Sequence, residues 1–525
     1  MRALERLGRR KVNPDEIIGR DLARGLAAIS TELNRQVGLL IHRSGRVETV
    51  IVGDYDRIVI PALAGVRTAG GRLRGLRCVH TVLGTAGLND EDIMDLACLR
   101  LDLMSVLTIR DGLPDQLHSA HLVPGGRGGR DWAELEPVHP ATQQQSCIAL
   151  IEALEEEFSR SRPIRDVDMG QDRAILIGVT TGSRDAAEES MRELVELARS
   201  AGVRVLARVI QRRRRIHPRF ILGRGKLMEI VIMSLRLGAN LLLFDRELSP
   251  SQVRSVTDHT DLRVIDRTQL ILDIFAGRAR SREGKLQIEM AQLRYMLPML
   301  STRDDALSRL TGGIGARGPG ETRLEIDRRR INDRINRLAA ELKRVGRQRY
   351  HRRSRRRKRD VPVVSLVGYT NAGKSTLLNT LTRSDIQAED LLFATLDPTS
   401  RRLRFPRDME VIVTDTVGFI RNLPAELLKA FESTLEELFE ADLLLHVIDI
   451  SNPAWQGQAE VVDNLLRELG LARIPRLAVY NKLDLAGEEM RQRLAHMDGV
   501  GISAVDATTL APLLERVEEM LLRQL

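Results

Sequence analysis

The pattern that constrains this chain most is a glycine-rich turn held between an apolar strand and an amphipathic helix. The run VPVVSLVGYTNAGKSTLLNTL contains G-x-x-x-x-G-K-S from Gly368 to Ser375. In such a P-loop, the glycines let backbone N–H groups and the helix N-terminus surround phosphates. Lys374 reaches the terminal phosphates, and the Ser375 hydroxyl binds magnesium. The motif therefore predicts an α/β domain with a nucleotide site.

Two later segments indicate which nucleotide this site selects. VIVTDTVG ends an apolar strand with Asp415 and Gly418, so a carboxylate can hold the magnesium shell and a glycine N–H can meet the γ-phosphate. In N-K-L-D, residues 481–484, Asp484 can accept both N–H donors of guanine. Adenine would leave that carboxylate unpaired, a mismatch that costs about 10⁴ or more in discrimination. Ser503-Ala504 follows the last strand, where a backbone N–H can meet guanine O6, and GTP is the predicted ligand.

Hydrophobic patterns divide the chain into four regions. Residues 1–165 contain a polar helix followed by short apolar runs with hairpin turns, which predicts an α+β extension. Residues 170–280 alternate strands with helices, as a parallel α/β domain does. Residues 281–360 are expected to form a helical arm, and residues 361–525 the GTP-binding (G) domain. The predicted fold class is α/β, with a mixed, mostly parallel sheet in the G domain.

The third region has the spacing of a two-helix coiled coil. Apolar residues recur at steps of three, four and seven between Leu286 and Leu300 and again between Leu324 and Val345. Between them lies GGIGARGPG, residues 312–320, which is either a flexible connector or a loop whose backbone approaches another surface closely. The second helix runs into Lys343–Arg359, a segment with eleven basic residues and no acidic one.

The eleven positive charges of this basic block exceed the net charge of the whole chain, which is +9, so the basicity of the protein is local. Such a block usually meets a polyanion; a solvated helix end is the alternative. Aromatic residues are only 3% of the chain, which argues against base-stacking RNA-binding domains. Nucleic acid is therefore expected to be bound through phosphates and shape, with no DNA specificity.

Composition also bears on the location of the protein. The longest strongly apolar stretch, Leu227–Phe244, is interrupted by charged residues and is too short to span a membrane. The N-terminus lacks the apolar stretch of a secretory signal. We expect a cytoplasmic protein that can associate with membranes only peripherally. Cys78, Cys98 and Cys147 are too widely spaced for a disulfide framework or a metal knuckle, and we expect buried thiols.

Taken together, these motifs resemble the HflX family of P-loop GTPases over residues 173–505. The resemblance rests on GYTNAGKST, FATLDPT, DTVGFI and NKLD in the G domain, and on FDRELSPSQ, DRTQLILDIFAGRA and LSRLTGGIGARGPGETRLEIDRRR before it. It implies that Thr395 completes the magnesium shell with Ser375, and that Lys374, Thr395, Asp415 and Gly418 are catalytic. Nucleotide contacts are expected from Gly368, Tyr369, Thr370, Asn371, Ala372, Gly373, Lys374, Ser375, Phe393, Ala394, Thr395, Leu396, Asp397, Asp415, Thr416, Val417, Gly418, Asn481, Lys482, Leu483, Asp484, Ser503, Ala504 and Val505.

Two residues near the phosphates bear on the rate of hydrolysis. Phe419 follows Gly418 at the place where Ras-like enzymes have a glutamine that orients the attacking water, which predicts slow intrinsic hydrolysis. Asn371 occupies the P-loop position that, in related GTPases, helps to hold a potassium ion whose charge replaces an arginine finger. A hydrogen bond within its own loop is an equally good interpretation of Asn371.

HflX proteins bind the large ribosomal subunit and are implicated in splitting stalled or stress-damaged ribosomes. By resemblance, we expect a monomer that binds this subunit and its ribosomal RNA and that hydrolyses GTP when the ribosome stimulates it. The residues expected to contact RNA are Gly312, Gly313, Gly315, Arg317, Gly318, Gly320, Arg352, Arg353, Arg355, Arg356 and Arg357. Two alternatives stay open: an ATP-dependent factor that remodels ribosomal RNA, and an RNA-binding scaffold that GTP only locks in one conformation.

Part of the N-terminal extension resembles a metalloprotease motif in degenerate form. Residues 79–97 are similar to the H-x-H…S-x-x-D pattern of JAMM-type enzymes, but Val82 and Asn89 replace two of its residues. A three-ligand zinc site cannot form from this motif. We therefore expect His80 and Asp92 to be structural residues.

Overall fold

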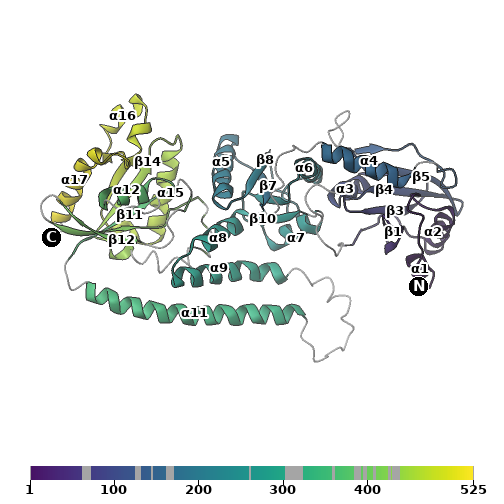
Figure 1. The fold of residues 1–525 in the computed structure, drawn as a ribbon, viewed down its shortest axis with the longest axis horizontal. Coiled ribbons are helices and arrows are strands. Elements are labelled where there is room, and N and C mark those ends of the chain that lie inside the picture. Colours follow the sequence, from purple (N-terminus) through teal and green to yellow (C-terminus); the bar gives the residue numbers. More distant parts are fainter. Residues whose placement is uncertain are drawn as a thin grey trace. The chain divides into compact units, whose positions relative to one another are not determined.

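The structure is a computed structural model that divides into two compact units, drawn in Figure 1. The first comprises Met1–Val195 with Gly202–Arg267, and the second comprises Glu196–Ala201 with Thr268–Leu525. The residues described are 2–61, 73–123, 132–143, 146–160, 171–258, 260, 262–301, 323–356, 361–382, 392–393, 399–405, 409–421, 423, 427 and 438–523.

The first unit begins with a six-stranded mixed sheet in the order β2-β1-β3-β4-β5-β6. Its strands are β1 (Val37–His42), β2 (Val47–Val52), β3 (Leu76–Leu83), β4 (Leu103–Arg110), β5 (Leu113–Leu122) and β6 (Trp132–Glu134). Its helices are α1 (Arg2–Gly8), α2 (Arg20–Leu33), α3 (Asp90–Cys98) and α4 (Cys147–Arg160). A hairpin turn at Ser44-Gly45, of the kind predicted for residues 1–165, joins β1 to β2, and α3 forms the crossover between the parallel strands β3 and β4. The three cysteines are buried free thiols, as predicted.

A second, fully parallel sheet follows in the order β10-β9-β7-β8. Its strands are β7 (Arg173–Thr180), β8 (Arg204–Arg212), β9 (Leu241–Phe244) and β10 (Arg263–Asp266), and its helices are α5 (Arg184–Ser200), α6 (Arg224–Leu237) and α7 (Pro250–Asp258). At the end of β10, the guanidinium of Arg267 is almost fully buried and pairs with Glu193 at 2.7 Å and with Asp245 at 3.0 Å. These ion pairs tie the carboxyl ends of β9 and β10 to α5.

Helix α6 packs against both sheets of the first unit. Leu227 and Ile230 lie in the core of the parallel sheet, whereas Val231 packs with Met94 and Cys98 of α3. A helix that is apolar on two sides is stable in water only when neighbours cover both of those sides. This double coverage accounts for the long apolar stretch of the sequence that begins at Leu227. Within the described part of the chain, none of the helices combines the length and the hydropathy that a membrane span requires.

In the second unit, two long helices pair as their spacing predicts. Helix α8 (Arg267–Arg278) leads into α9 (Arg282–Ser301), which packs along α11 (Arg323–Arg356). Glu289 accepts two hydrogen bonds from Arg334, at 2.7 and 3.0 Å, and Arg282 pairs with Glu341 at 3.3 Å. The earlier residue of α9, Arg282, thus pairs with the later residue of α11, Glu341. The two helices are therefore antiparallel.

The G domain contains a six-stranded sheet in the order β12-β13-β11-β14-β15-β16, in which only β12 is antiparallel. Its strands are β11 (Val363–Gly368), β12 (Thr399–Arg404), β13 (Glu410–Asp415), β14 (Leu443–Asp449), β15 (Arg476–Asn481) and β16 (Val500–Gly501). Its helices include α12 (Lys374–Thr382), α15 (Trp455–Glu468), α16 (Glu488–Leu494) and α17 (Ala511–Leu522). Parallel pairing of β11 with both β13 and β14 places the ends of three strands at one edge.

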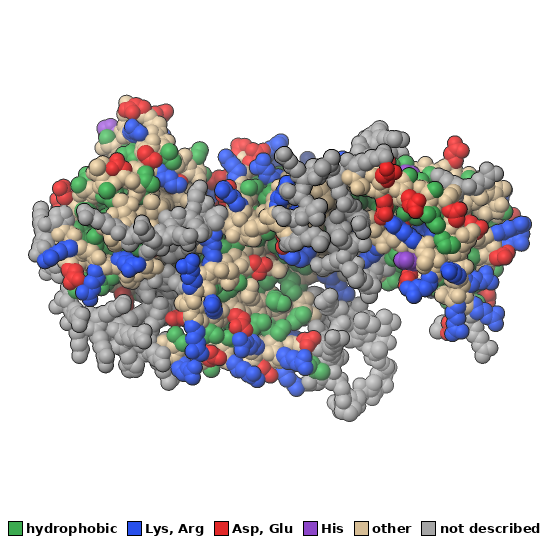
Figure 2. Space-filling view, viewed as in Figure 1, with side chains coloured by type: hydrophobic (Ala, Val, Ile, Leu, Met, Phe, Trp, Pro, Cys, Tyr) green, Lys and Arg blue, Asp and Glu red, His purple; other side chains and the backbone are tan. Residues whose placement is uncertain are grey.

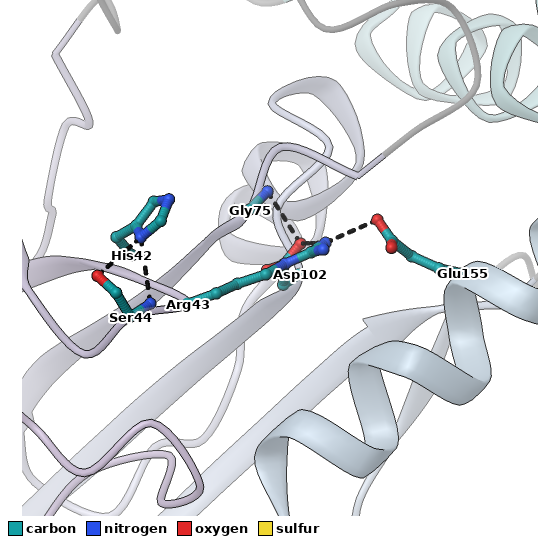
Figure 3. Close-up of polar contacts among 6 residues, drawn as sticks. All are labelled: His42, Arg43, Ser44, Gly75, Asp102 and Glu155. Atoms are coloured by element: carbon teal, nitrogen blue, oxygen red, sulfur yellow. Dashed lines mark hydrogen bonds and ion pairs between the residues drawn. The ribbon is translucent and has the colours of Figure 1, made fainter.

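A partly buried group of ion pairs holds the N-terminal sheet to α4. Figure 3 shows Arg43, at the end of β1, with both Asp102 oxygens (2.6 and 2.8 Å) and with Glu155 of α4 (2.8 Å). The Asp102 side chain is only 1% exposed, and the backbone N–H of Gly75 also donates to it. Burial raises the pKa of Asp102, and the hydrogen bonds from Arg43 oppose that rise. The guanidinium therefore keeps an otherwise costly carboxylate in place.

Replacing Arg43 by alanine should destabilise the first unit by about 3 kcal/mol, because it leaves the buried Asp102 carboxylate without its counter-charge. The measurement is chemical denaturation of the full chain with a probe in the first unit. Arg46→Ala is the matched control, since Arg46 pairs with Glu48 at an exposed site and exposed pairs contribute at most about 1 kcal/mol. Equal effects of the two substitutions would contradict the structural role of Arg43.

Candidate functional site

The P-loop lies between the end of β11 and the start of α12, where glycine is required at two positions. A Cβ on Gly368 would lie 2.3 Å from the carbonyl oxygen of Val447, and one on Gly373 would lie 2.2 Å from the Asn481 amide nitrogen. Gly373 also has φ +89°, in the left-handed region. Between them, Asn371 has φ +61°, which asparagine tolerates better than most residues. The backbone thus has the tight curl that the sequence motif predicts.

Lys374 is buried at the first position of α12. Its ammonium group donates to the carbonyl oxygens of Gly368 (3.2 Å) and Tyr369 (2.8 Å), so it lies folded against the loop. Burial lowers the pKa of Lys374 to about 8, and the nearby Asp415 carboxylate opposes this shift. A phosphate group would favour the charged form and replace the lost hydration. The side chain is therefore poised to bind an anion.

Ser375 and Asp415 come together from different elements. The Ser375 hydroxyl, on α12, donates to a carboxylate oxygen of Asp415, at the end of β13, over 2.7 Å. The next residue, Thr416, fixes the chain by donating its hydroxyl to the Leu366 carbonyl at 2.6 Å. A hydroxyl oxygen and a buried carboxylate at this spacing are oxygen donors of the kind that Mg²⁺ prefers. The donor set fits a magnesium site beside the phosphates.

The segment after Asp415 is hydrogen-bonded directly to the P-loop. The Thr370 N–H donates to the Phe419 carbonyl (2.8 Å), and the Phe419 N–H donates to the Gly368 carbonyl (3.1 Å). A Cβ on Gly418 would lie 2.9 Å from Thr370 Cα and 3.1 Å from the Lys374 nitrogen, so this position requires glycine. The Phe419 side chain is 2% exposed. It is packed away from solvent and has no polar group with which to orient water.

The predicted guanine-recognition residues meet at the ends of β15 and β16. Asn481 donates to the Ala372 carbonyl (2.8 Å) and accepts from the Ala504 N–H (2.9 Å), so it links the P-loop to the last loop. Asp484 is exposed and accepts a hydrogen bond from the Ser503 hydroxyl (2.6 Å). Lys482 has φ +64° and pairs with Asp449 at 2.7 Å. These contacts hold the Asp484 carboxylate at the same edge of the sheet as the P-loop.

Several predicted residues are not part of this cluster. Phe393 packs on Phe275 of α8, and Val505 is exposed. Ala394, Thr395, Leu396 and Asp397 lie outside the described residues. The same is true of Gly312, Gly313, Gly315, Arg317, Gly318, Gly320 and Arg357. Arg352, Arg353, Arg355 and Arg356 belong to α11, but their side chains are outside the description.

Sequence reasoning missed a structural role for two residues of the site. The Tyr369 hydroxyl accepts a hydrogen bond from the Arg421 N–H at 2.9 Å, which adds a third link between the P-loop and the segment after Asp415. Lys482 was included only as part of its motif, although its ion pair with Asp449 spans two strands. In neither case does sequence spacing reveal the partner, because the contact depends on how adjacent strand ends face each other.

In the N-terminal extension, His80 and Asp92 form a buried pair. His80 Nε2 and an Asp92 oxygen are 2.9 Å apart, and both side chains are at most 5% exposed. Asp92 also accepts from the Asn89 N–H, and Asn89 accepts from the Asp92 N–H in return, which caps α3. Within the described residues, no three His, Cys, Asp or Glu side chains are grouped so that they could hold a metal. Asp92 therefore both takes part in the cap of α3 and pairs with His80.

The fold and the arrangement at this sheet edge define a P-loop GTPase. Three family models match the chain: the N-terminal region of a GTP-binding GTPase (residues 188–276), the middle region of such a GTPase (278–356) and a 50S ribosome-binding GTPase (363–482). The chain belongs to the HflX GTPase family, and it therefore hydrolyses GTP to GDP and phosphate.

Two relatives support this assignment. A GTPase HflX from Caldanaerobacter subterraneus subsp. tengcongensis is 48% identical over 67% of this chain and 82% of its own length. A GTPase HflX from Lacrimispora saccharolytica is 50% identical over 67% of this chain and 84% of its own. Among solved structures, a GTP-binding protein from Sulfolobus solfataricus in complex with GDP covers 68% of this chain and all of its own, with 24% identity and a TM-score of 0.38. The assignment rests on the sequence relatives.

Binding of GDP should be accompanied by proton uptake near pH 8. In the empty site Lys374, with a pKa of about 8, is half deprotonated at that pH, and bound phosphates restore its charge. About half a proton per GDP should be taken up at pH 8, and much less at pH 7. Calorimetry in buffers of different ionisation enthalpy measures this number.

Lys374→Arg is the control for this prediction, because arginine stays charged across the range. The variant should bind GDP, even if more weakly, without the pH-dependent proton uptake. Unchanged uptake in the variant would show that another group titrates.

Proposed function

We propose that this GTPase binds the large ribosomal subunit and splits or rescues stalled ribosomes under stress, with hydrolysis stimulated by the ribosome. The observation that carries the proposal is the paired α9–α11 arm with its basic helix. The description of the matching G-domain model as a 50S ribosome-binding GTPase also supports it. The protein would act as a cytoplasmic monomer that can associate peripherally with membranes.

The arm has the properties that a polyanionic partner requires. One side of α11 packs on α9, and Leu338 is fully buried there. Basic side chains of α11 remain exposed, namely Arg328, Arg329, Arg330, Arg334, Arg337, Lys343 and Arg344. Figure 2 shows basic side chains along the arm, mixed with acidic groups. Contacts of this kind bind phosphates without reading DNA sequence, and they weaken steeply as salt rises. The predicted RNA-contacting residues 312–320 lie between the two helices of this arm in the sequence.

Hydrolysis would use the side chains of the P-loop edge. Ser375 and, by resemblance, Thr395 would hold a magnesium ion that supplies positive charge to the phosphate oxygens. Lys374 would leave its carbonyl partners and bind the terminal phosphates, and the Gly418 N–H would donate to the γ-phosphate. Because Phe419 cannot orient water, the attacking water would have to be positioned by other groups, which the ribosome would order. Intrinsic turnover should therefore be slow.

Asn371 is the residue through which a potassium ion would contribute. Its backbone is in the left-handed region, and the residue is exposed. If potassium is held there, hydrolysis at equal ionic strength should be at least about tenfold faster in potassium than in sodium, because removal of one charge-stabilising group lowers kcat by about 10²–10³. Steady-state phosphate release measures the rates. Equal rates would leave Asn371 with a role inside its own loop.

Ribosome splitting should depend on nucleotide. When ribosomes are sedimented with the protein, GTP or a non-hydrolysable analogue should place it on the large subunit and increase free subunits, whereas GDP should do neither. The Lys374→Ala variant should not split ribosomes with any of these nucleotides. A Lys374→Ala protein that still splits ribosomes would favour the scaffold alternative, in which GTP only locks a conformation.

Deleting residues 312–320 supplies the matched control for the arm. The shortened protein should bind GDP as the intact chain does, because the G domain is unchanged, but should no longer split ribosomes. If it splits them at the normal rate, the arm does not carry the activity. Replacing GTP by ATP in the same assay tests the ATP-dependent remodelling alternative.

A further inference from the structure

Two residues of α8 hold a short segment of the G domain. The ring of Phe275 lies 4.5 Å from the ring of Phe393, centroid to centroid, at an interplanar angle of 50°. On the next turn of α8, the Arg278 guanidinium donates to the carbonyl oxygen of Leu392 at 2.8 Å. The Leu392 N–H donates in turn to the Ser200 hydroxyl at the end of α5 (3.1 Å). All of these residues belong to the second unit.

We call the contact of Phe275 and Arg278 with Leu392 and Phe393 the anchor, and its apolar side chains are buried. Phe275 is 0% exposed, Phe393 is 2% and Leu392 is 7%. Both backbone polar groups of Leu392 are satisfied by side chains from α5 and α8, so the segment is fixed in position by directional bonds as well as by packing. The contact is therefore specific for this segment of the chain.

The backbone at Phe393 is strained. Its φ of +60° lies in the left-handed region, where an aromatic residue is rare. Such a conformation persists only where the surroundings over-determine it, and it is most often found at functional sites. Here the surroundings are the Phe275 ring and the bonds on either side of Leu392. The anchor therefore fixes the backbone conformation of Phe393 itself.

The position of Phe393 matters for hydrolysis because Thr395, the magnesium ligand of the proposed mechanism, is only two residues further along the sequence. Two residues span at most about 7 Å, so the position of the anchor limits where the Thr395 hydroxyl can lie. Small displacements of a catalytic group lower the rate far more than they lower the affinity for product.

We propose that Phe275 and Arg278 of α8 are positioning residues for GTP hydrolysis, which act by holding Leu392 and Phe393 so that Thr395 reaches the magnesium ion. The proposal rests on the proposed role of Thr395 and is independent of ribosome splitting. It assigns a part of the hydrolytic machinery to the DRTQLILDIFAGRA motif, outside the G domain. Since α8 leads into α9, the same contact links the nucleotide segment to the arm.

The test is steady-state hydrolysis by the full chain without ribosomes. Arg278→Ala removes the hydrogen bond to Leu392, and it should lower kcat about tenfold and raise the Mg²⁺ concentration for half-maximal rate several-fold. The Kd for GDP should change less than about twofold, because GDP does not require the γ-phosphate contacts. Arg278→Gln, which retains a donor amide, should recover part of kcat. Arg473→Ala, which alters an exposed arginine of the G domain, is the matched control and should leave all three quantities unchanged.

A second substitution distinguishes positioning from stability. Phe275→Leu keeps the core apolar, and it should lower kcat in the same way. The double variant Phe275→Leu/Arg278→Ala should be about as slow as the slower single variant, because both changes release the same segment. A lower melting temperature with unchanged kcat and Mg²⁺ dependence would overturn the proposal, and so would an equal loss of GDP and GTP affinity. Failure here would leave the ribosome assays unaffected, since those test a different step.

Discussion

The parallel pairing of β11 with its two neighbours is the constraint on which the site depends. Because β13 and β14 both run parallel to β11, their carboxyl ends lie at the same edge as the P-loop. Asp415 ends β13 beside Leu366 of β11, which brings its carboxylate to Ser375. Asn481 ends β15 and reaches Ala372 of the loop. Segments far apart in the chain thus form one site without any of them leaving its strand end.

Desolvation supplies much of the chemistry at this edge. Lys374 is almost fully buried, so little water can hydrate its ammonium group, which relies on two backbone carbonyls. Neutral acceptors are weak substitutes for water or for a phosphate, so the empty site is held in a state that favours anion binding. A side chain at Gly418 would crowd Thr370 and the Lys374 ammonium group, so glycine at this position leaves that group unobstructed.

Sequence reasoning recovered those features that local patterns encode. The P-loop, the apolar strands and the pairing of the two long helices each follow from spacing, and the motifs after β13 and β15 follow from their position at strand ends. Contacts between distant side chains could not be found this way. The ion pair of Arg43 with Asp102 spans 59 positions, and the packing of Phe275 on Phe393 joins two motifs that looked independent. Neither contact leaves a periodic pattern in the sequence, because only tertiary packing brings these residues together.

The apolar stretch that begins at Leu227 is a further case, and it has a practical consequence. Its interruption by charge excludes a membrane helix, but only the structure explains why so many apolar residues are needed: α6 has a partner on each side. Ile232 and Leu235 belong to the same buried cluster as Leu96 and Ala97 of α3. A fragment that begins between residues 160 and 171 would lack α3 and would therefore expose this face of α6. Expressed alone, such a fragment would self-associate through this exposed apolar surface.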